Sequence, residues 1–149
     1  MSTKIELHFN RSLDLDLLEK GIKIWLTRIV AEVCFKTKDN NWTRPYEAII
    51  DTGAPVSLIP FSIWQKVDPK ILADYKISGI VSNENCSLPV KVGNVSCRIM
   101  GISSSTDELG INAYLTLTDK VPLIIGFDSL LTDLKLVSDY KTKIAYFET

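Results

Sequence analysis

Asp51 is the residue of this chain best placed for chemistry, because it stands between two apolar segments. The segment before it, residues 46–50, reads as a strand that enters a core, and residues 57–59 read as its continuation. A carboxylate is rarely buried without a partner. Two carboxylates that share one proton can activate water, so the question is where a second carboxylate would come from. For Asp51-Thr52-Gly53 alone, a plain turn in which the aspartate bonds to its own backbone is the simpler interpretation.

A second informative segment lies 75 residues further along the chain, where Gly126 follows the apolar run 123–125. The residues after Gly126 predict a short helix from Ser129 to about residue 134, with Asp128 as its N-cap. Taken by itself, this segment predicts a buried strand that leads into a helix. That interpretation is compatible with a scaffold that supports Asp51.

Together, the two segments resemble the signature of the retropepsin-like aspartic proteases. The first part is Asp51-Thr52-Gly53-Ala54 within a hydrophobic strand–loop–strand, and the second is Ile124-Ile125-Gly126 followed by Asp128. The resemblance extends over roughly residues 29–147. It implies that Asp51 is the catalytic carboxylate and that Thr52 bonds to the same loop of a second copy. It also implies that the Gly53 amide donates to the carboxylate, that Ala54 lets the loop close, and that Ile124, Ile125 and Gly126 pack against the loop.

The number of Asp-Thr-Gly motifs in the chain determines how many copies the expected active site needs. The sequence contains one Asp-Thr-Gly and no Asp-Ser-Gly, so one chain supplies only one of the two carboxylates. The resemblance therefore implies a symmetric homodimer with Asp51 of each copy at the two-fold axis. The expected function is that of an aspartic endopeptidase, in which the two Asp51 carboxylates activate a water that hydrolyses an extended peptide. That chemistry needs no metal and no other cofactor.

A covering flap is expected within residues 76–90, centred on Ile77, Ser78, Gly79 and Ile80. An extended peptide would lie between this hairpin and the floor of the site. The single glycine of the flap leaves an alternative open: a catalytically weak or inactive protease-like module for peptide binding or dimerisation. A structural β-barrel with an ordinary turn at Asp51 is a third interpretation. Candidate pocket residues, which are more often plain core, are Ile49, Val56, Ile80, Val81, Pro122 and Leu123.

Composition restricts the other classes of function. Of the 149 residues, 46% are hydrophobic and 23% are charged, as expected for one globular domain. The net charge of −1 and the scattered basic residues argue against a nucleic-acid or membrane surface, and the first residues do not read as a signal peptide. Cys34, Cys86 and Cys97 have no metal-ligand spacing and predict reduced thiols in a cytoplasmic protein. His8 is the only histidine, which disfavours zinc and the serine or cysteine protease triads.

The pattern of short alternating segments predicts an all-β fold, and the resemblance implies a closed acid-protease-like barrel with one or two short helices. Gly93-Asn94 is a candidate hairpin turn, and residues 60–67 are a candidate helix. Ser12 is a candidate cap for a short helix to Gly21, although residues 13–17 also alternate like a strand. Residues 1–21 are expected to be an N-terminal extension or edge strand of uncertain role, and residues 22–149 the protease-like domain. Strands are expected at residues 4–9, 22–26, 29–35, 42–50, 76–81, 86–92, 95–102, 111–117, 136–138 and 144–147.

Overall fold

The alternating segments form strands in the computed structural model, which describes residues 2–78 and 87–149. The helical segments in these ranges are short: α1 Leu15–Glu19, α2 Phe61–Trp64 and the 3-10 helix η1 Leu131–Asp133. The prediction of a mostly β fold with one or two short helices is therefore confirmed. The strands are β1 Lys4–Glu6, β2 His8–Leu13, β3 Trp25–Phe35, β4 Tyr46–Ile50, β5 Ser57–Ile59, β6 Lys70–Ile77, β7 Leu88–Met100, β8 Leu109–Thr116, β9 Ile124–Ile125, β10 Lys135–Asp139 and β11 Ile144–Glu148.

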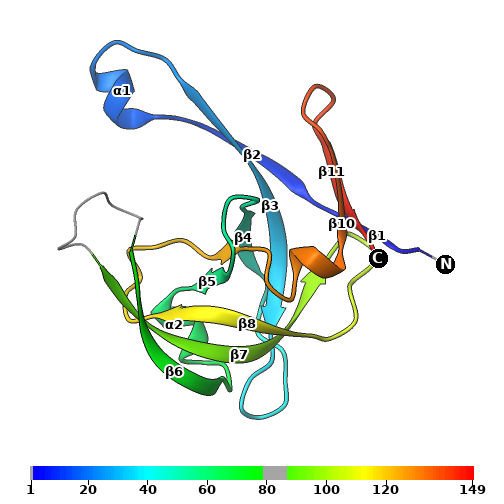
Figure 1. Ribbon diagram of the computed structural model, residues 1–149. Coiled ribbons are helices and arrows are strands. Elements are labelled where there is room, and N and C mark those ends of the chain that lie inside the picture. Colours follow the sequence, from blue (N-terminus) through cyan, green and yellow to red (C-terminus); the bar gives the residue numbers. More distant parts are fainter. Residues whose placement is uncertain (1, 79–86) are drawn as a thin grey trace.

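Two sheets organise these strands (Figure 1). The smaller sheet has the strand order β1-β11-β10, and the larger has the order β2-β3-β4-β9-β5-β8-β7-β6. An additional antiparallel pairing joins β3 to β7, where Phe35 lies opposite Cys97. Because of this pairing, β3, β4, β9, β5, β8 and β7 form a continuous ring of paired strands. Side chains that point inward from the ring meet in one core.

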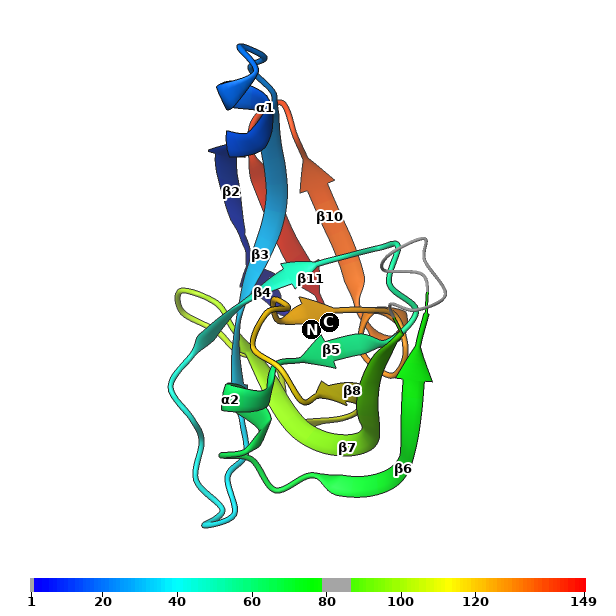
Figure 2. The same cartoon turned by 90° about the vertical axis from the view of Figure 1, so that its left-hand side faces the viewer.

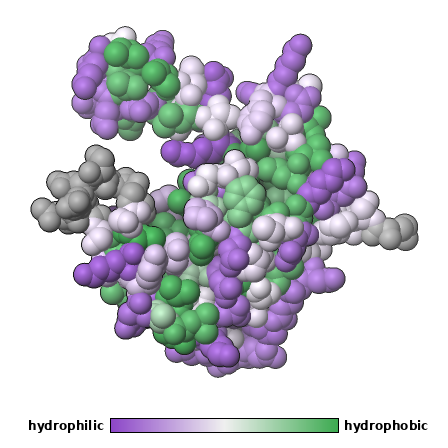
Figure 3. Space-filling view, in the orientation of Figure 1, coloured by the Kyte–Doolittle hydropathy of each residue, from purple (hydrophilic) through white to green (hydrophobic). Residues whose placement is uncertain are grey.

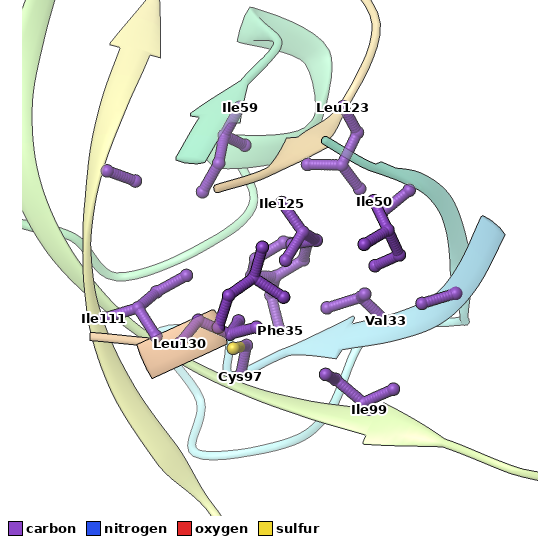
Figure 4. Packing of buried hydrophobic residues seen from close by; sticks show 14 of the residues in the cluster. Val33, Phe35, Ile50, Ile59, Cys97, Ile99, Ile111, Leu123, Ile125 and Leu130 are labelled. Carbon is purple, nitrogen blue, oxygen red and sulfur yellow. The ribbon is translucent and has the colours of Figure 1, made fainter. Parts of the chain in front are cut away.

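The core occupies the inside of this ring (Figure 4). Every second residue of β7 from Gly93 to Ile99 is buried, which is the period of a strand with one face turned inward. The side chains that meet there come from strands far apart in the sequence, such as Phe35 of β3, Ile111 of β8 and Ile125 of β9. Long-range strand pairing therefore builds the support under Asp51.

The predicted hairpin turn at Gly93-Asn94 is wrong, because β7 continues through both residues. Gly93 lies opposite Ile71 of β6 and opposite Ala113 of β8. A Cβ atom at position 93 would lie 2.7 Å from Leu115 Cδ1. The glycine therefore allows close packing between strands and does not serve a turn.

Strand β6 begins earlier than the strand predicted at residues 76–81. Its residues are exposed apart from the half-buried Ile77. A strand with no buried face does not need alternating apolar residues, so its start could not be located from such a pattern. Its position is set by antiparallel pairing with β7, from Lys70 opposite Asn94 to Ile77 opposite Leu88. The two other expected flap residues, Gly79 and Ile80, lie outside the described residues.

A projecting hairpin, which we call the arm (residues 8–28), consists of β2, α1 and the first part of β3 (Figures 1 and 2). Asp14 caps α1, and not Ser12: the Leu17 amide donates to Asp14 Oδ1 at 3.1 Å. Leu15 and Trp25 of the arm are 71% and 50% exposed, and Figure 3 shows apolar surface at the tip of the arm.

Residues before the arm belong to the body of the molecule. Ile5 of β1 is fully buried and lies opposite Phe147 of β11. The Leu7 amide donates to the Ala145 carbonyl oxygen at 3.0 Å, and the Leu7 side chain is also buried. The start of the chain therefore completes the sheet that the C-terminal hairpin β10–β11 forms.

Of the two helices predicted after Asp51, one is confirmed over a shorter range, and the other is reduced to the 3-10 helix η1 and lacks the predicted cap. The helix α2 begins after Pro60, and Trp64 Nε1 donates to the Thr116 carbonyl oxygen at 2.6 Å. Asp128 does not cap a helix, because Ser129 has a positive φ of 55° and η1 begins only at Leu131. No helix within the described ranges is long and apolar enough to cross a membrane.

Candidate active site

Asp51 follows the last residue of β4, where the backbone is held by a strand from the other end of the chain. Strands β4 and β9 pair in parallel, with Ile50 opposite Ile125, and the Asp51 amide donates to the Ile125 carbonyl oxygen at 3.0 Å. Ile50 and Ile125 are both buried. The Asp51 side chain is half-buried, so a carboxylate on a rigid backbone remains accessible to a small molecule such as water.

The loop after Asp51 orients this carboxylate. The Gly53 amide donates to Asp51 Oδ1 at 2.8 Å, and the Ala54 amide donates to the Asp51 carbonyl oxygen at 3.1 Å. The hydrogen bond from Gly53 holds one oxygen of the carboxylate. A plain turn, in which an aspartate bonds to its own backbone, would use the same hydrogen bond. The Thr52 side chain is exposed and makes no hydrogen bond within the described residues. Its expected bond to a second copy stays a prediction.

The second predicted segment packs directly against this loop. The Phe127 amide donates to the Ala54 carbonyl oxygen at 3.0 Å, and the Asp128 amide donates to the Pro55 carbonyl oxygen at 2.9 Å. A Cβ atom on Gly126 would lie 2.6 Å from the Val56 carbonyl carbon and 2.7 Å from the Ala54 carbonyl oxygen. The backbones therefore approach so closely that only glycine fits at position 126. The structure thus brings together the two segments that the sequence singled out.

Ser57 also supports the loop, although sequence reasoning assigned it no role. Its side chain is fully buried, and its Oγ accepts a hydrogen bond from the Gly126 amide at 3.0 Å. The bond satisfies a backbone donor that would otherwise be buried without a partner. The available signal was a single polar residue in the otherwise apolar run from Val56 to Pro60.

A groove of about 530 Å³ runs past Asp51 and includes part of the expected flap. Ile77 and Ser78 line it, as does Val56 among the candidate pocket residues. Leu123 is buried in the core instead, Pro122 is exposed, and Val81 lies outside the described residues. The complete lining is Asp51, Gly53, Ala54, Pro55, Val56, Leu58, Tyr75, Ile77, Ser78, Tyr114 and Ile124.

A second cavity, of about 270 Å³, is also lined by Asp51, together with Thr52. Its other walls come from β3, from the end of β4, and from β10 with the turn that follows it. Arg28 is the only basic residue in the lining, which consists of Thr27, Arg28, Ile29, Ile49, Ile50, Asp51, Thr52, Leu136 and Tyr140. Asp51 therefore lines both the groove and this second cavity, whereas Thr52 lines only the second cavity.

Tyr114 is one of the polar side chains that line the groove. Burial raises the pKa of the Tyr114 hydroxyl, and the neighbouring Tyr75 and Asp128 raise it further. Tyr114 is therefore a neutral hydrogen-bonding group at neutral pH. Within the described part of the chain, no cluster of three or more His, Cys, Asp or Glu side chains is arranged to hold a metal ion.

Comparison with known proteins finds a solved structure that this chain resembles at low sequence identity. No protein-family model and no curated protein matches the sequence. Among solved structures, the chain is similar to a retropepsin-like aspartic protease from Rickettsia conorii, with 14% sequence identity and a TM-score of 0.44. The alignment covers 95% of this chain and 94% of the Rickettsia chain. Because both the identity and the TM-score are low, any assignment of function depends on the geometry around Asp51.

Proposed function

We propose that this chain is an aspartic endopeptidase that works as a homodimer, with one Asp51 from each copy forming the catalytic pair. The observation that carries the proposal is the placement of Asp51: its backbone is fixed by β9, one carboxylate oxygen is held by the Gly53 amide at 2.8 Å, and its side chain lines a groove of about 530 Å³. A half-buried carboxylate at the floor of a groove is suited to proton transfer.

The reaction follows from two carboxylates that hold one proton between them, since two like charges in contact do not both ionise. The ionised Asp51 takes a proton from a bound water, and the water oxygen attacks the carbonyl carbon of the peptide bond. Asp51 of the partner subunit, which carries the shared proton, donates it to the carbonyl oxygen. When the tetrahedral intermediate collapses, the C–N bond breaks and the departing nitrogen takes up a proton from the pair. One hydroxyl of the intermediate returns its proton to the pair as the carbonyl re-forms, so the pair again holds one proton.

The exposure of the loop supports the homodimer. A single chain carries one Asp-Thr-Gly, and the Thr52 side chain beside Asp51 is exposed. Asp51 and Thr52 also line the cavity of about 270 Å³ beside β3 and β10, whose lining does not include Gly53 and Ile77 of the groove. A second copy related by a two-fold axis would place its own Asp51 and Thr52 against these residues.

The substrate of this proposed enzyme is an extended peptide. Its backbone would lie in the groove beside Ile77 and Ser78, with alternate side chains directed to opposite walls. We interpret the ring of six paired strands as the closed acid-protease-like barrel that the sequence resemblance implies. Cys34 and Cys97 are buried free thiols, which agrees with a reducing compartment such as the cytoplasm.

The test is digestion of a peptide library between about pH 3.5 and 7, the range in which a shared-proton pair is active. Asp51→Asn is expected to lower the rate at least about 100-fold, because it removes the group that transfers the proton. Asp107→Asn is the matched control, because Asp107 is an exposed acid that lines neither cavity beside Asp51. Equal cleavage by the Asp51→Asn and wild-type chains would rule the proposal out. Peptide binding without turnover in either chain would favour the binding-module alternative.

A further inference from the structure

A third cavity, of about 290 Å³, adjoins the groove that contains Asp51. The two hollows share three side chains, Val56, Tyr75 and Tyr114. The rings of Tyr75 and Tyr114 stack with their centroids 5.8 Å apart and their planes 22° apart. A peptide that lies in the groove can therefore send a side chain past these rings into the adjoining cavity.

The walls of this cavity are mostly apolar, but one member of its lining carries a charge. Leu72 and Val92 contribute aliphatic surface, and Tyr75 and Tyr114 contribute ring faces. Leu72 and Tyr75 are each 52% exposed, so this apolar surface is open to a ligand. Asp128 is the charged residue, and Asn112 is the remaining polar one. An apolar surface with one carboxylate matches a side chain that is aliphatic along its length and cationic at its tip.

The Asp128 carboxylate is held in place by a chain of amide hydrogen bonds. Asn94 Nδ2 donates to Asn112 Oδ1 at 3.2 Å, which leaves Asn112 Nδ2 to donate to Asp128 Oδ2, also at 3.2 Å. Ser129 Oγ accepts a hydrogen bond from the backbone N–H of Asn112 at 2.9 Å and donates to Asp128 Oδ2 at 3.4 Å. The other oxygen, Oδ1, accepts no hydrogen bond within the described residues.

The charge of Asp128 is also uncompensated by its described neighbours. The ion pairs within the described residues do not include Asp128. They join Lys36 to Glu108, Lys91 to Asp74, and Lys135 to Glu148. Asp128 does not cap a helix either, since η1 begins after it with Leu130 at the N-cap position. The carboxylate thus has one oxygen oriented by Asn112 and one available for a cation. Its negative charge is one of the causes that raise the pKa of Tyr114.

We propose that this cavity is a substrate subsite that takes a lysine or arginine side chain of the peptide, with Asp128 as the residue that recognises the positive charge. The inference rests on the proposed function, because the peptide is assumed to lie in the groove beside Asp51. The methylene groups of the side chain pack on Leu72 and Val92, and the cation meets both the Asp128 carboxylate and the tyrosine rings. The enzyme would then prefer peptides with a basic residue at one position away from the cleaved bond.

The test measures peptide binding by the Asp51→Asn chain, so that its outcome does not depend on turnover. The probes are ten-residue apolar peptides in which one lysine, norleucine or glutamate is moved through successive positions. At one position, lysine is expected to bind about fivefold more tightly than norleucine, and glutamate more weakly than either. Adding Asp128→Asn should bring the lysine-to-norleucine ratio close to one, whereas Asp128→Glu, which keeps the charge, should retain a preference for lysine.

Asp74→Asn is the matched control, because Asp74 is an acid of β6 that pairs with Lys91 and does not line this cavity. Added to the Asp51→Asn chain, it should leave the ratio of lysine-peptide to norleucine-peptide affinity unchanged. A lysine preference that survives Asp128→Asn, or an equal loss of all peptides in that variant, would overturn the subsite. If the wild-type chain cleaves peptides but shows no lysine preference, the subsite fails and the endopeptidase stands. If nothing is cleaved but the preference depends on Asp128, the subsite stands and the endopeptidase fails.

Discussion

Two glycines shape the surroundings of Asp51, and they do so for different reasons. Gly53 brings a backbone amide within 2.8 Å of the carboxylate, and a Cβ atom there would still lie 3.2 Å from Asp51 Oδ1. Gly126 instead lies where a Cβ atom would meet backbone atoms of Ala54 and Val56 within 2.7 Å. Backbone atoms of a paired loop move only with the loop itself. The spacing at Gly126 therefore sets the position of the loop that carries Asp51.

The first prediction concerns Gly126→Ala. Forcing a methyl group against the Val56 backbone should destabilise the protein by about 1–3 kcal/mol. Gly110→Ala is the matched control, because a Cβ atom there would meet only Asn94 Oδ1, at 3.8 Å. Urea unfolding of both variants gives the comparison. Equal free energies of unfolding for the two variants would show that the two segments are not packed as described.

The second prediction concerns Cys97 and alkaline pH. Burial raises the pKa of the Cys97 thiol to about 12, from an ordinary value of 9.0. Above pH 9 the unfolded chain therefore loses this proton while the folded chain keeps it, so stability falls as pH rises from 9 toward 12. This group should contribute a slope of up to about 1.4 kcal/mol per pH unit. Cys97→Ala should show a shallower decline between pH 9 and 10.5 in urea unfolding, and equal slopes would contradict the prediction.

Among the elements, the two-residue strand β9 has the largest effect on the site for its length. It lies between β4 and β5 in the larger sheet. It pairs in parallel with β4 and antiparallel with β5, where Leu58 lies opposite Ile124. Because β4 and β5 flank the loop that contains Asp51, β9 holds both ends of this loop. Ser57 of β5 then accepts the amide hydrogen bond of Gly126, the residue that follows β9. The elements that hold the loop are thus separated by about half the chain.

The third prediction tests whether the first residues of the chain belong to the folded body. Ile5→Ala should lower the free energy of unfolding by about 2–5 kcal/mol, because Ile5 of β1 is fully buried opposite Phe147. Leu15→Ala in the arm is the control and should change it by less than about 0.5 kcal/mol, because Leu15 is 71% exposed. Thermal or urea unfolding measures both. A negligible effect of Ile5→Ala would instead support a detachable N-terminal extension.

At the scale of the whole molecule, the proposed function requires two copies, because each contributes one Asp51. The fourth prediction is therefore that Asp51→Asn chains inhibit the wild-type enzyme when the two are mixed and allowed to exchange. If mixed dimers are inactive, a fixed amount of wild-type chain keeps about half its activity at equal amounts and about one tenth at a ninefold excess. A peptide-cleavage assay after subunit exchange measures this.

The control for the mixing experiment is Asp107→Asn, which is expected to form active mixed dimers and so to leave the wild-type contribution unchanged. Sedimentation at the assay concentration shows whether dimers are present. Wild-type activity that is unaffected by any excess of the Asp51→Asn chain, in a sample shown to exchange subunits, would mean that one chain holds a complete site.

The sequence by itself determined the features that depend on neighbouring residues in the chain. Asp51, Thr52 and Gly53 specify a turn because an aspartate side chain can accept the amide hydrogen bond two residues later, and this bond is present at 2.8 Å. Pro60 starts α2 because its fixed φ suits the beginning of a helix. Period-two alternation predicted strands at the C-terminus, where β10 and β11 form.

Only the tertiary structure decided the features that depend on pairing between distant segments. Gly93 and Asn94 have the composition of a turn, yet they lie within β7 because β6 and β8 pair with them on both sides. Ser57 gains its role only from the amide of Gly126, and Asp128 lines a cavity only because β6, β7 and β8 supply its other walls. Such contacts join residues tens of positions apart, and local propensity carries no information about them because their energy exists only once the strands have assembled.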